Sequence, residues 1–474
     1  MKQKFAFNGR IIIVGYGSVG RCTLAMLTET IDIPLSNIRI IDGEDQSSLI
    51  QTYQQKGVHY DVNPIYPHNL NDVLQKHAKA GDVLLNLSVS VSSIDLMNWC
   101  HDHQVLYLDT CIEPWEGYYD NPKFTMAERS NYHLRYSALE NAKRWGKKAT
   151  SALITHGANP GLISHFVKAA LIEISKKKNP KFTQHPKTQS EWANLSYKLG
   201  VKVIQVAEHD TQISNHPKRP DEFVNTWSID GFYSEGMQPA ELGWGSHEKK
   251  MPKDGYKHTI GSRSAIYLGQ PGLVTEVRSW TPLSGPMNGF CITHGEAISL
   301  SDYLTVKEKR KIIYRPTVYY AYHPCNDAVL SMREVAMKNW HLQKTTRLLN
   351  KEIIEGGDEL GALLLGDHGG LWYGSLLNNN KARQLLDGEF SATSLQIAAP
   401  VVAGAIWLIK NPNQGLVEPE ALDYQEIIDI CLPYLGDVKG VWTDWTPLKG
   451  RNQLFKEENI DDQDPWQFQN FRLS

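Results

Sequence analysis

The sequence predicts an α/β domain followed by an α+β domain whose sheet is mainly antiparallel. Through the first 150 residues, short apolar runs alternate with helical segments, which is the pattern of parallel strands joined by helices. A glycine-rich turn separates the first apolar run from the first helical segment. Between residues 199 and 322, short strand-like runs are instead punctuated by Gly and Pro, as in a mostly antiparallel sheet.

In the first domain, the predicted strands are apolar runs of only four or five residues, which is too short for buried helices. One helix is indicated by Ile94, Met97 and Cys100, because apolar residues recur there at helical spacing. The predicted strands are Ile11–Val14, Ile38–Ile41, Val83–Leu87, Val105–Leu108 and Ala152–Thr155, and the predicted helices are Arg21–Thr28, Ser93–His103 and Phe124–Trp145.

Further along the chain, the polar segment Lys176–Thr188 predicts a loop at a domain boundary. The segment Ser394–Lys410 is apolar nearly all round, which predicts a buried helix, kinked at Pro400. The strands expected in the middle region are Val201–Val206, Ala265–Leu268, Leu273–Val277 and Thr317–Tyr320.

The charge balance argues against two classes of partner. The 474 residues include 49 Lys and Arg and 52 Asp and Glu, so the formal net charge is −3. A nucleic-acid-binding domain is usually strongly basic, and a protein held at a membrane surface often carries a polybasic segment. We therefore expect neither nucleic acid nor a membrane as a partner.

Cysteine usage and apolar patterning predict a location. None of the 6 cysteines has a Cys-x-x-Cys neighbour, and scattered cysteines in a long chain are typical of a reducing compartment. Residues 1–10 lack the apolar region of a signal peptide. The longest apolar stretch, Leu395–Ile409, is shorter than the ~18 residues of a membrane span. The expected location is the cytoplasm.

The glycine-rich turn has the Gly-x-Gly-x-x-Gly spacing of a Rossmann-type dinucleotide-binding site. It follows a predicted strand and opens a predicted helix, and Asp42 ends the next strand, 22 residues after the last glycine. The glycines bring backbone N–H groups to a pyrophosphate, while Asp42 accepts hydrogen bonds from the adenosine ribose. No Arg near Asp42 could receive a 2′-phosphate, which favours NAD over NADP. The alternative is a glycine-rich turn in an unrelated α/β protein. The predicted cofactor-binding residues of the turn are Gly15, Gly17, Ser18, Val19 and Gly20.

Polar residues follow three further predicted strands. Ligands of doubly wound sheets bind at the carboxyl ends of strands, so these residues are expected to face the same cofactor. The alternative is that they serve ordinary turns. Asn159, within Asn-Pro-Gly, is favoured because it would place an amide at the nicotinamide end. The candidates are Asn86, Ser88, Asp109, Thr110, Asn159 and Gly161.

Acidic and aromatic residues are interleaved between residues 208 and 296. Glu208 follows a strand-like run, and Trp227 and Glu235 frame a segment that also contains Asp230. Carboxylates beside large aromatic rings suit an organic cation, because a buried ammonium needs charge partners and a Trp face adds about 0.5–2 kcal/mol. The alternative is that the acids are solvated and the Trp residues belong to the core. Because no His-x-x-x-His or His-Glu-x-x-His pair occurs, no metal site is predicted.

Together these motifs resemble the bacterial homospermidine synthase family, which belongs to the saccharopine-dehydrogenase-like group. The resemblance covers roughly Ile11 to Leu435, and its most specific part runs from Trp227 to Gly245. It implies an NAD-dependent reaction in which two putrescine molecules give homospermidine and ammonia. Oxidation to an imine, amine exchange and re-reduction by the same cofactor would be the steps. The resemblance also implies a homodimer that acts on putrescine and related diamines.

The same resemblance implies roles for individual residues. Glu208 and Glu235 would hold ammonium groups, and Trp227 would offer its ring face to the cationic intermediate. Asn159 would bridge cofactor and substrate, and His294 would line the pocket. The remaining catalytic candidates are Glu113 and Asp358.

The expected domain plan combines the patterning with the resemblance. Residues 1–155 form the nucleotide-binding domain, joined by a returning helical part at about residues 356–435. Residues 156–355 form the substrate and dimerisation domain, and residues 436–474 form a C-terminal extension.

Two other functions remain open at this point. A saccharopine-type amino-acid dehydrogenase would need Arg or Lys for the carboxylates of its substrate, whereas the middle motifs are acidic and aromatic. A non-catalytic regulator would bind NAD and a polyamine without turning them over.

Overall fold

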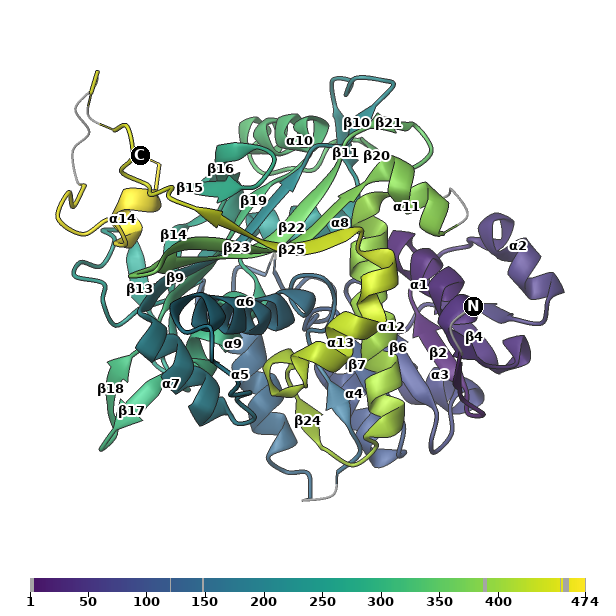
Figure 1. Cartoon of the computed structure of the whole chain (residues 1–474). Coiled ribbons are helices and arrows are strands. Elements are labelled where there is room, and N and C mark those ends of the chain that lie inside the picture. The colour runs from purple at the N-terminus through teal and green to yellow at the C-terminus, as the bar shows by residue number, and fades with distance from the viewer. Residues whose placement is uncertain are drawn as a thin grey trace.

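Two β-sheets and a long helix between them organise the chain (Figure 1). The computed structural model describes residues 4–119, 121–146, 149–386, 390–451, 453–454 and 460–473. One sheet is parallel and is formed mostly by the N-terminal part of the chain, and the other is larger and mainly antiparallel. The predicted combination of a Rossmann-type α/β part with an α+β part is therefore confirmed.

The parallel sheet has seven strands in the order β24-β8-β7-β6-β2-β4-β5. Its central strands are buried on both faces, which explains why they are continuous apolar runs in the sequence. Edge strand β24 lies far along the chain, so the chain returns to this sheet. The strands are β2 (Ile11–Val14), β4 (Ile38–Asp42), β5 (His59–Val62), β6 (Val83–Asn86), β7 (Leu106–Asp109), β8 (Ala152–Leu153) and β24 (Leu416–Val417).

The larger sheet has ten strands, eight of them in the order β13-β14-β12-β19-β9-β22-β23-β25. Neighbouring strands are antiparallel except β19 and β9, which are parallel. The hairpin β15–β16 joins the sheet beside β19. The strands are β9 (Val201–Asp210), β12 (Pro239–Gly243), β13 (Gly255–Lys257), β14 (Ala265–Pro271), β15 (Glu276–Thr281), β16 (Gly285–Phe290), β19 (Thr317–His323), β22 (Gly357–Gly366), β23 (Gly369–Asn378) and β25 (Asp437–Thr443).

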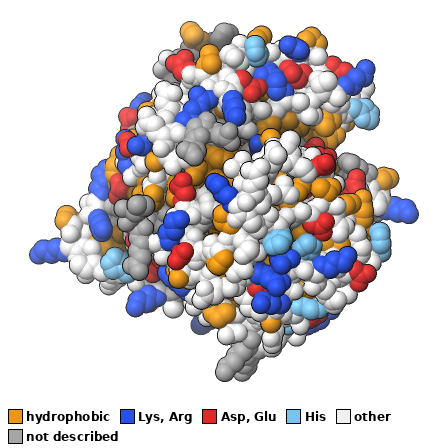
Figure 2. Space-filling model, turned by 90° about the vertical axis from the view of Figure 1, so that its right-hand side faces the viewer, with side chains coloured by type: hydrophobic (Ala, Val, Ile, Leu, Met, Phe, Trp, Pro, Cys, Tyr) orange, Lys and Arg blue, Asp and Glu red, His pale blue; other side chains and the backbone are white. Residues whose placement is uncertain are grey.

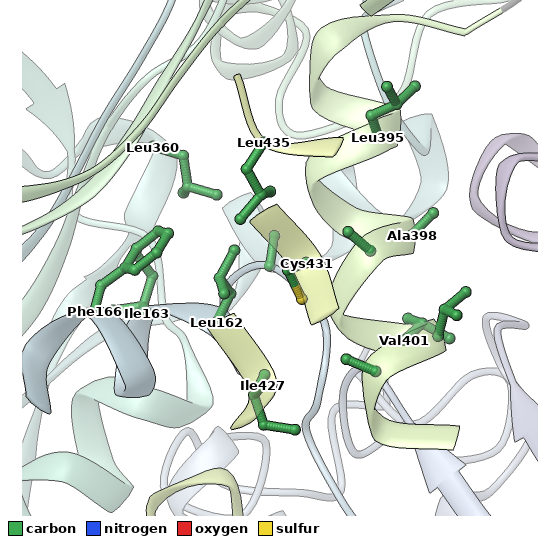
Figure 3. Close-up of a cluster of buried hydrophobic side chains, with 14 of the residues drawn as sticks. Leu162, Ile163, Phe166, Leu360, Leu395, Ala398, Val401, Ile427, Cys431 and Leu435 are labelled. Carbon is green, nitrogen blue, oxygen red and sulfur yellow. The ribbon is translucent and has the colours of Figure 1, made fainter. Parts of the chain in front are cut away.

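Helix α12 (Ala392–Lys410) connects the two sheets. It packs against α1 (Ser18–Thr30) and β7 on one side and against β22 and α13 (Tyr424–Cys431) on the other. Figure 3 shows Leu395, Ala398 and Val401 of α12 in the hydrophobic cluster that also contains α6 (Leu162–Lys178) and α13. By length and composition α12 could cross a membrane, but 89% of its most apolar window is buried within the protein. Its all-round apolarity is thus explained by a position inside the core.

The remaining elements cover the sheets or form short two-stranded ribbons. The ribbons pair β1 with β3, β10 with β21, β11 with β20 and β17 with β18. The helices are α2 (Ser47–Gln55), α3 (Leu70–His77), α4 (Ser93–Asp102), α5 (Asn131–Ala142), α7 (Gln189–Leu199), α8 (Ile229–Met237), α9 (Gly295–Tyr303), α10 (Asn326–Met337), α11 (Asn379–Leu385) and α14 (Phe468–Phe471). The ribbon strands are β1 (Phe5–Ala6), β3 (Ile31–Asp32), β10 (Ile213–Ser214), β11 (Glu222–Asn225), β17 (Val306–Glu308), β18 (Lys311–Tyr314), β20 (Thr345–Leu348) and β21 (Ile353–Glu355).

Several predicted boundaries were wrong. The helix expected at Phe124–Trp145 is only α5, because the Ser130 side chain caps its first turn at Asn131. The strand expected at Leu273–Val277 begins as a single 3₁₀ turn and becomes strand β15 only at Glu276. Two further differences concern whole segments of the chain.

The expected helical return at about residues 356–435 begins instead with β22 and β23, two ten-residue strands of the larger sheet. The polar segment at residues 176–188 does not divide domains, because α6 before it and α7 after it both pack on the larger sheet. Strand β25, in the expected C-terminal extension, pairs with β23 along the edge of that sheet.

Candidate active site

A cavity with about 860 Å³ of empty space, part of it open to solvent, lies where the carboxyl ends of the parallel strands meet one face of the larger sheet. Its walls also include residues of α8 and the first turns of α12. Figure 2 views the molecule from the side on which α2 lies, where hydrophobic side chains gather in a recess between an upper and a lower part. Ten predicted site residues line the cavity, namely Val19, Ser88, Thr110, Glu113, Asn159, Glu208, Trp227, Glu235, His294 and Asp358.

The glycine-rich turn has the geometry of a pyrophosphate cradle. Gly15 has φ +95°, and a Cβ there would lie 2.7 Å from the Leu87 carbonyl oxygen. A Cβ on Gly20 would lie 2.2 Å from the Gly15 carbonyl oxygen, whereas a Cβ on Gly17 would meet no heavy atom within 4 Å. Open space above Gly17, at the N-terminus of α1, fits the close approach of a phosphate group.

Asp42 stands at the end of β4 beside this turn. Its carboxylate accepts hydrogen bonds from the backbone N–H groups of Tyr16 and, at 2.7 Å, of Glu44. Each carboxylate oxygen has a further lone pair available for a ribose hydroxyl. Asp42 therefore fixes the turn and remains suited to the ribose.

Three residues predicted to bind the cofactor fix the backbone and side chains next to the cavity. The buried Asp109 carboxylate accepts hydrogen bonds from the Thr155 backbone at 2.6 Å and the Tyr107 hydroxyl at 2.9 Å. Asn86 accepts a 2.6 Å hydrogen bond from Ser88 Oγ. Gly161, with φ +128°, shapes the turn that carries Asn159. The side chains of Asn86 and Asp109 do not line the cavity.

Strand register explains how three acidic residues converge. Glu208 and Asp210 are two residues apart on β9 and therefore share a face, and Asp358 on β22 lies opposite Asp210. The Glu208 carboxylate accepts hydrogen bonds from Asn159 Nδ2 at 2.8 Å and from the Tyr320 hydroxyl at 2.6 Å. Two of these acids, Glu208 and Asp358, reach the cavity.

The acidic cluster is held in an environment that disfavours negative charge. Burial raises the pKa of Glu208 to about 7, although the Tyr320 and Asn159 hydrogen bonds lower it. Burial also raises the pKa of Asp210 to about 6. The pKa of Asp358 is raised well above its usual value by burial and by the charges of Glu208 and Asp210. A cation in the cavity would relieve this repulsion, so the site is suited to a positively charged ligand.

His294 lies between two carboxylates, and its ring centroid is 4.4 Å from that of Tyr320. Its Nε2 is 3.1 Å from Glu235 Oε2, and its Nδ1 is 3.3 Å from Glu296 Oε1. Burial alone would lower the pKa of His294, but the charges and hydrogen bonds of Glu235 and Glu296 raise it to about 10. At neutral pH this imidazole is therefore a cation and a proton donor.

Trp227 and Glu113 complete the predicted cavity wall. Trp227 Nε1 donates a 3.1 Å hydrogen bond to the Tyr322 hydroxyl, which fixes the plane of the indole ring. Glu113 accepts hydrogen bonds from Cys111 Sγ at 3.1 Å and from the Ser90 backbone at 3.4 Å. Burial raises the pKa of Glu113 to about 6.

Several residues that line the cavity were not predicted from the sequence. Tyr320 was predicted only as part of a strand, although its hydroxyl donates directly to Glu208. Thr393, which donates a 2.8 Å hydrogen bond to Asp358, and Gln396 lie near the start of α12. Buried polar residues in the first turns of a largely apolar helix were a signal that could have identified them.

Comparison with known proteins identifies the family. The model described as "Saccharopine dehydrogenase NADP binding domain" matches residues 11–153. The model described as "Saccharopine dehydrogenase C-terminal domain" matches residues 157–443.

Full-length relatives share nearly half of the sequence. The chain is 44% identical to homospermidine synthase of Blastochloris viridis, covering 98% of this chain and 97% of the relative. It is 43% identical to homospermidine synthase of Mesorhizobium japonicum, covering 98% and 96%. The crystal structure of the homospermidine synthase from Legionella pneumophila in complex with NAD superimposes with a TM-score of 0.92 at 45% identity, and all of both chains is covered. The chain therefore belongs to the homospermidine synthase family of saccharopine-dehydrogenase-like proteins.

Proposed function

We propose that this protein is an NAD-dependent homospermidine synthase, which converts two putrescine molecules into homospermidine and ammonia. The observation that carries the proposal is the cavity in which Glu208, Asp358 and Trp227 face the carboxyl ends of the parallel strands. Acidic groups and an aromatic face suit a diamine, and the adjacent glycine-rich turn suits a dinucleotide. Full-length relatives named homospermidine synthase support the same reading.

NAD would bind along the glycine-rich turn. Gly15, Gly17 and Gly20 would hold the pyrophosphate, and Asp42 would hold the adenosine ribose. The segment after Asp42 contains Glu44 and no nearby Arg, which favours NAD, as in the Legionella pneumophila complex. When bound, NAD supplies a hydride acceptor for an amine-bearing carbon and a hydride donor for the later C=N bond.

The residues of the chain would bind and orient the diamine. Glu208, fixed by Asn159 and Tyr320, would receive one ammonium group. Trp227 would stabilise the cationic imine through its ring face, and Glu235 would receive an amino group on the side of His294. Apolar residues at the same cavity, such as Leu360, would limit the access of water to the imine.

The decisive experiment is incubation of the purified protein with putrescine and NAD, followed by product identification. We expect homospermidine and ammonia in equal amounts, with NAD far below the putrescine concentration and no net NADH. A protein that formed NADH in proportion to an amino-acid substrate would be a saccharopine-type dehydrogenase instead. Binding of both ligands with no release of ammonia would favour a non-catalytic regulator.

The composition of the cavity already favours the diamine over an amino acid. Among the described residues that line it, none is Lys or Arg, so no basic side chain is placed to receive a substrate carboxylate. In contrast, four carboxylates line it, those of Glu113, Glu208, Glu235 and Asp358.

The assembly and location follow from the same proposal. The family resemblance supports a homodimer, which sedimentation analysis would test directly. The scattered cysteines, each free of disulfides, support a reducing compartment such as the cytoplasm.

A further inference from the structure

A second chamber adjoins the main cavity. Its empty space, part of which is open to solvent, is about 550 Å³, compared with about 860 Å³ on the same basis for the main cavity. The two share Cys111, Glu113, Pro160, Glu235 and His294 as lining residues, whereas Val19 of the cofactor turn lines only the main cavity. The chamber therefore lies on the side of Glu235 and His294 that faces away from the cofactor turn.

One buried acceptor in this chamber has no partner. Gln238 follows the last turn of α8, and its side chain is only 4% exposed. Its amide nitrogen donates a 3.4 Å hydrogen bond to the Ser234 carbonyl oxygen. Its Oε1 atom accepts no hydrogen bond from any described part of the chain. A buried acceptor of this kind calls for a ligand that brings an N–H or O–H donor.

Two cations line the chamber, Arg135 and His294, and both are paired with carboxylates. Arg135 donates two hydrogen bonds to Glu418, at 2.6 and 2.9 Å, and a third to Asp302 at 3.2 Å. The lining also includes the acids Glu113 and Glu235 and the residue Gln238, whose Oε1 has no partner in the described chain. This set suits a small nitrogen ligand with several N–H bonds better than it suits an anion.

We propose that the second chamber receives the ammonia released during the reaction and holds it apart from the cofactor. This inference rests on the proposed function. In the releasing step, one carbon carries two amino groups, and the departing one is protonated. Its C–N bond breaks, the bonding electrons leave with the nitrogen as neutral ammonia, and the lone pair of the other nitrogen forms the C=N bond.

Separation of ammonia from the new C=N bond has a chemical reason. Ammonia is itself a nucleophile, and its return to the carbon would reverse the exchange before the reduction. The main cavity holds the amine chain and the cofactor during this interval, so a side chamber behind Glu235 offers the small product a separate place. Gln238 lines the chamber but not the main cavity, so its replacement tests the chamber separately.

The kinetic test compares wild type with Gln238→Met and with a matched control, Gln343→Met. Gln343 is also 4% exposed, donates to a helix carbonyl and leaves its Oε1 unpartnered within the described chain, but it lines neither space. The readouts are inhibition by added ammonium chloride and incorporation of ¹⁵N from ¹⁵NH₄⁺ into putrescine. We expect Gln238→Met to weaken both by roughly tenfold, the effect of losing one hydrogen bond to a charged group.

In the same variant, the KM for putrescine and the affinity for NAD should stay within about twofold of wild type, and Gln343→Met should match wild type throughout. Unchanged ammonium inhibition and ¹⁵N exchange in Gln238→Met would overturn the proposal.

A structural test does not require turnover. Crystals of the NAD-loaded protein soaked in methylammonium chloride should show methylammonium within hydrogen-bonding distance of Gln238 Oε1, and the Gln238→Met crystals should not. Methylammonium only beside Glu208, or none in the chamber, would overturn the inference. Failure of wild type to make homospermidine would instead reject the proposed function, so the two failures are distinguishable.

Discussion

At the scale of single residues, the protonation of Glu208 should control the binding of the diamine. Burial raises the pKa of Glu208 to about 7, so below that pH the carboxyl is neutral and attracts a cation weakly. We therefore expect kcat/KM for putrescine to rise as the pH increases through about 7 and to level off above it. Glu208→Gln should lower kcat/KM by roughly 10- to 100-fold, because one charged hydrogen-bond acceptor is lost.

The same variant tests the assignment of that pH dependence. A steady-state pH profile of kcat/KM reports groups of the free enzyme, and Glu208→Gln should flatten the rise near pH 7. If the rise persists unchanged in the variant, another acid is responsible. Glu113, whose pKa is raised to about 6, would then be the group to replace next.

The ring of Trp227 should stabilise the cationic intermediate rather than the fold. Replacement by Leu removes the aromatic face, and a cation–π contribution of about 0.5–2 kcal/mol corresponds to a loss of roughly 2- to 30-fold in kcat. Trp227→Phe keeps a ring but loses the hydrogen bond to Tyr322, and it should retain most of the activity. Thermal melts and NAD titrations should be unchanged in both variants, and equal turnover of Trp227→Leu and wild type would exclude a cation–π role.

Site residues could be predicted from the sequence where their contacts depend only on neighbours within one short segment. The glycine-rich turn is such a case, because its geometry depends on neighbours within one local segment. Tyr320 and Gln238 were not predicted, since their roles arise only when β19 lies beside β9 and α8 lies against the second chamber. Contacts of this kind depend on tertiary pairing that one sequence does not display.

At the scale of elements, the turn before α1 offers two matched substitutions with opposite expected effects. Gly20→Ala would force a methyl group to within 2.2 Å of the Gly15 carbonyl oxygen, so it should lower the free energy of unfolding by about 1–3 kcal/mol. Gly17→Ala meets no atom within 4 Å and has φ −69°, so the fold should tolerate it.

The added methyl group of Gly17→Ala would occupy the space of the pyrophosphate, and NAD affinity should fall by roughly tenfold, or about 1.4 kcal/mol. Calorimetric titration with NAD, combined with thermal denaturation, separates the two effects. If the folded Gly17→Ala variant bound NAD with full affinity, the pyrophosphate would have to bind at another position.

Element types were predicted best where local pattern and tertiary environment agree. The parallel strands were recognised because strands buried on both faces must be continuously apolar. Strand β22 was predicted within a helical region, and its four Leu residues among ten are compatible with a helix. Pairing with β9 and β23 on both edges overrides that preference.

At the scale of the whole molecule, the site exists because two sheets from different parts of the chain meet around α12. The parallel sheet contributes Ser88 and Thr110, and the larger sheet contributes Glu208 and Asp358. Helix α12 packs on both sheets and adds Thr393 to the same cavity. Small changes in the packing of α12 should therefore alter cofactor and substrate binding together.

The C-terminal region closes the other face of the larger sheet, and this role can be tested. Strand β25 covers the edge of β23, and the buried Phe471 packs near Tyr319 and Trp445, with ring centroids 6.0 and 6.2 Å away. Phe471→Ala would leave a cavity in this cluster and should lower the free energy of unfolding by about 3–5 kcal/mol. Leu454→Ala is a suitable control because Leu454 is 89% exposed, and its effect should stay within about 0.5 kcal/mol.

Phe471 and Glu208 lie on opposite faces of the larger sheet. The Phe471→Ala substitution should therefore affect catalysis only by lowering the overall stability of the protein. We expect Phe471→Ala to keep the wild-type KM for putrescine at 20 °C while its melting temperature falls by several degrees. Chemical denaturation and steady-state kinetics on the same preparation would compare the two quantities. If Phe471→Ala remains folded at the assay temperature but has a raised KM, the C-terminal region also shapes the cavity. If its melting temperature equals that of Leu454→Ala, the C-terminal region does not stabilise the sheet.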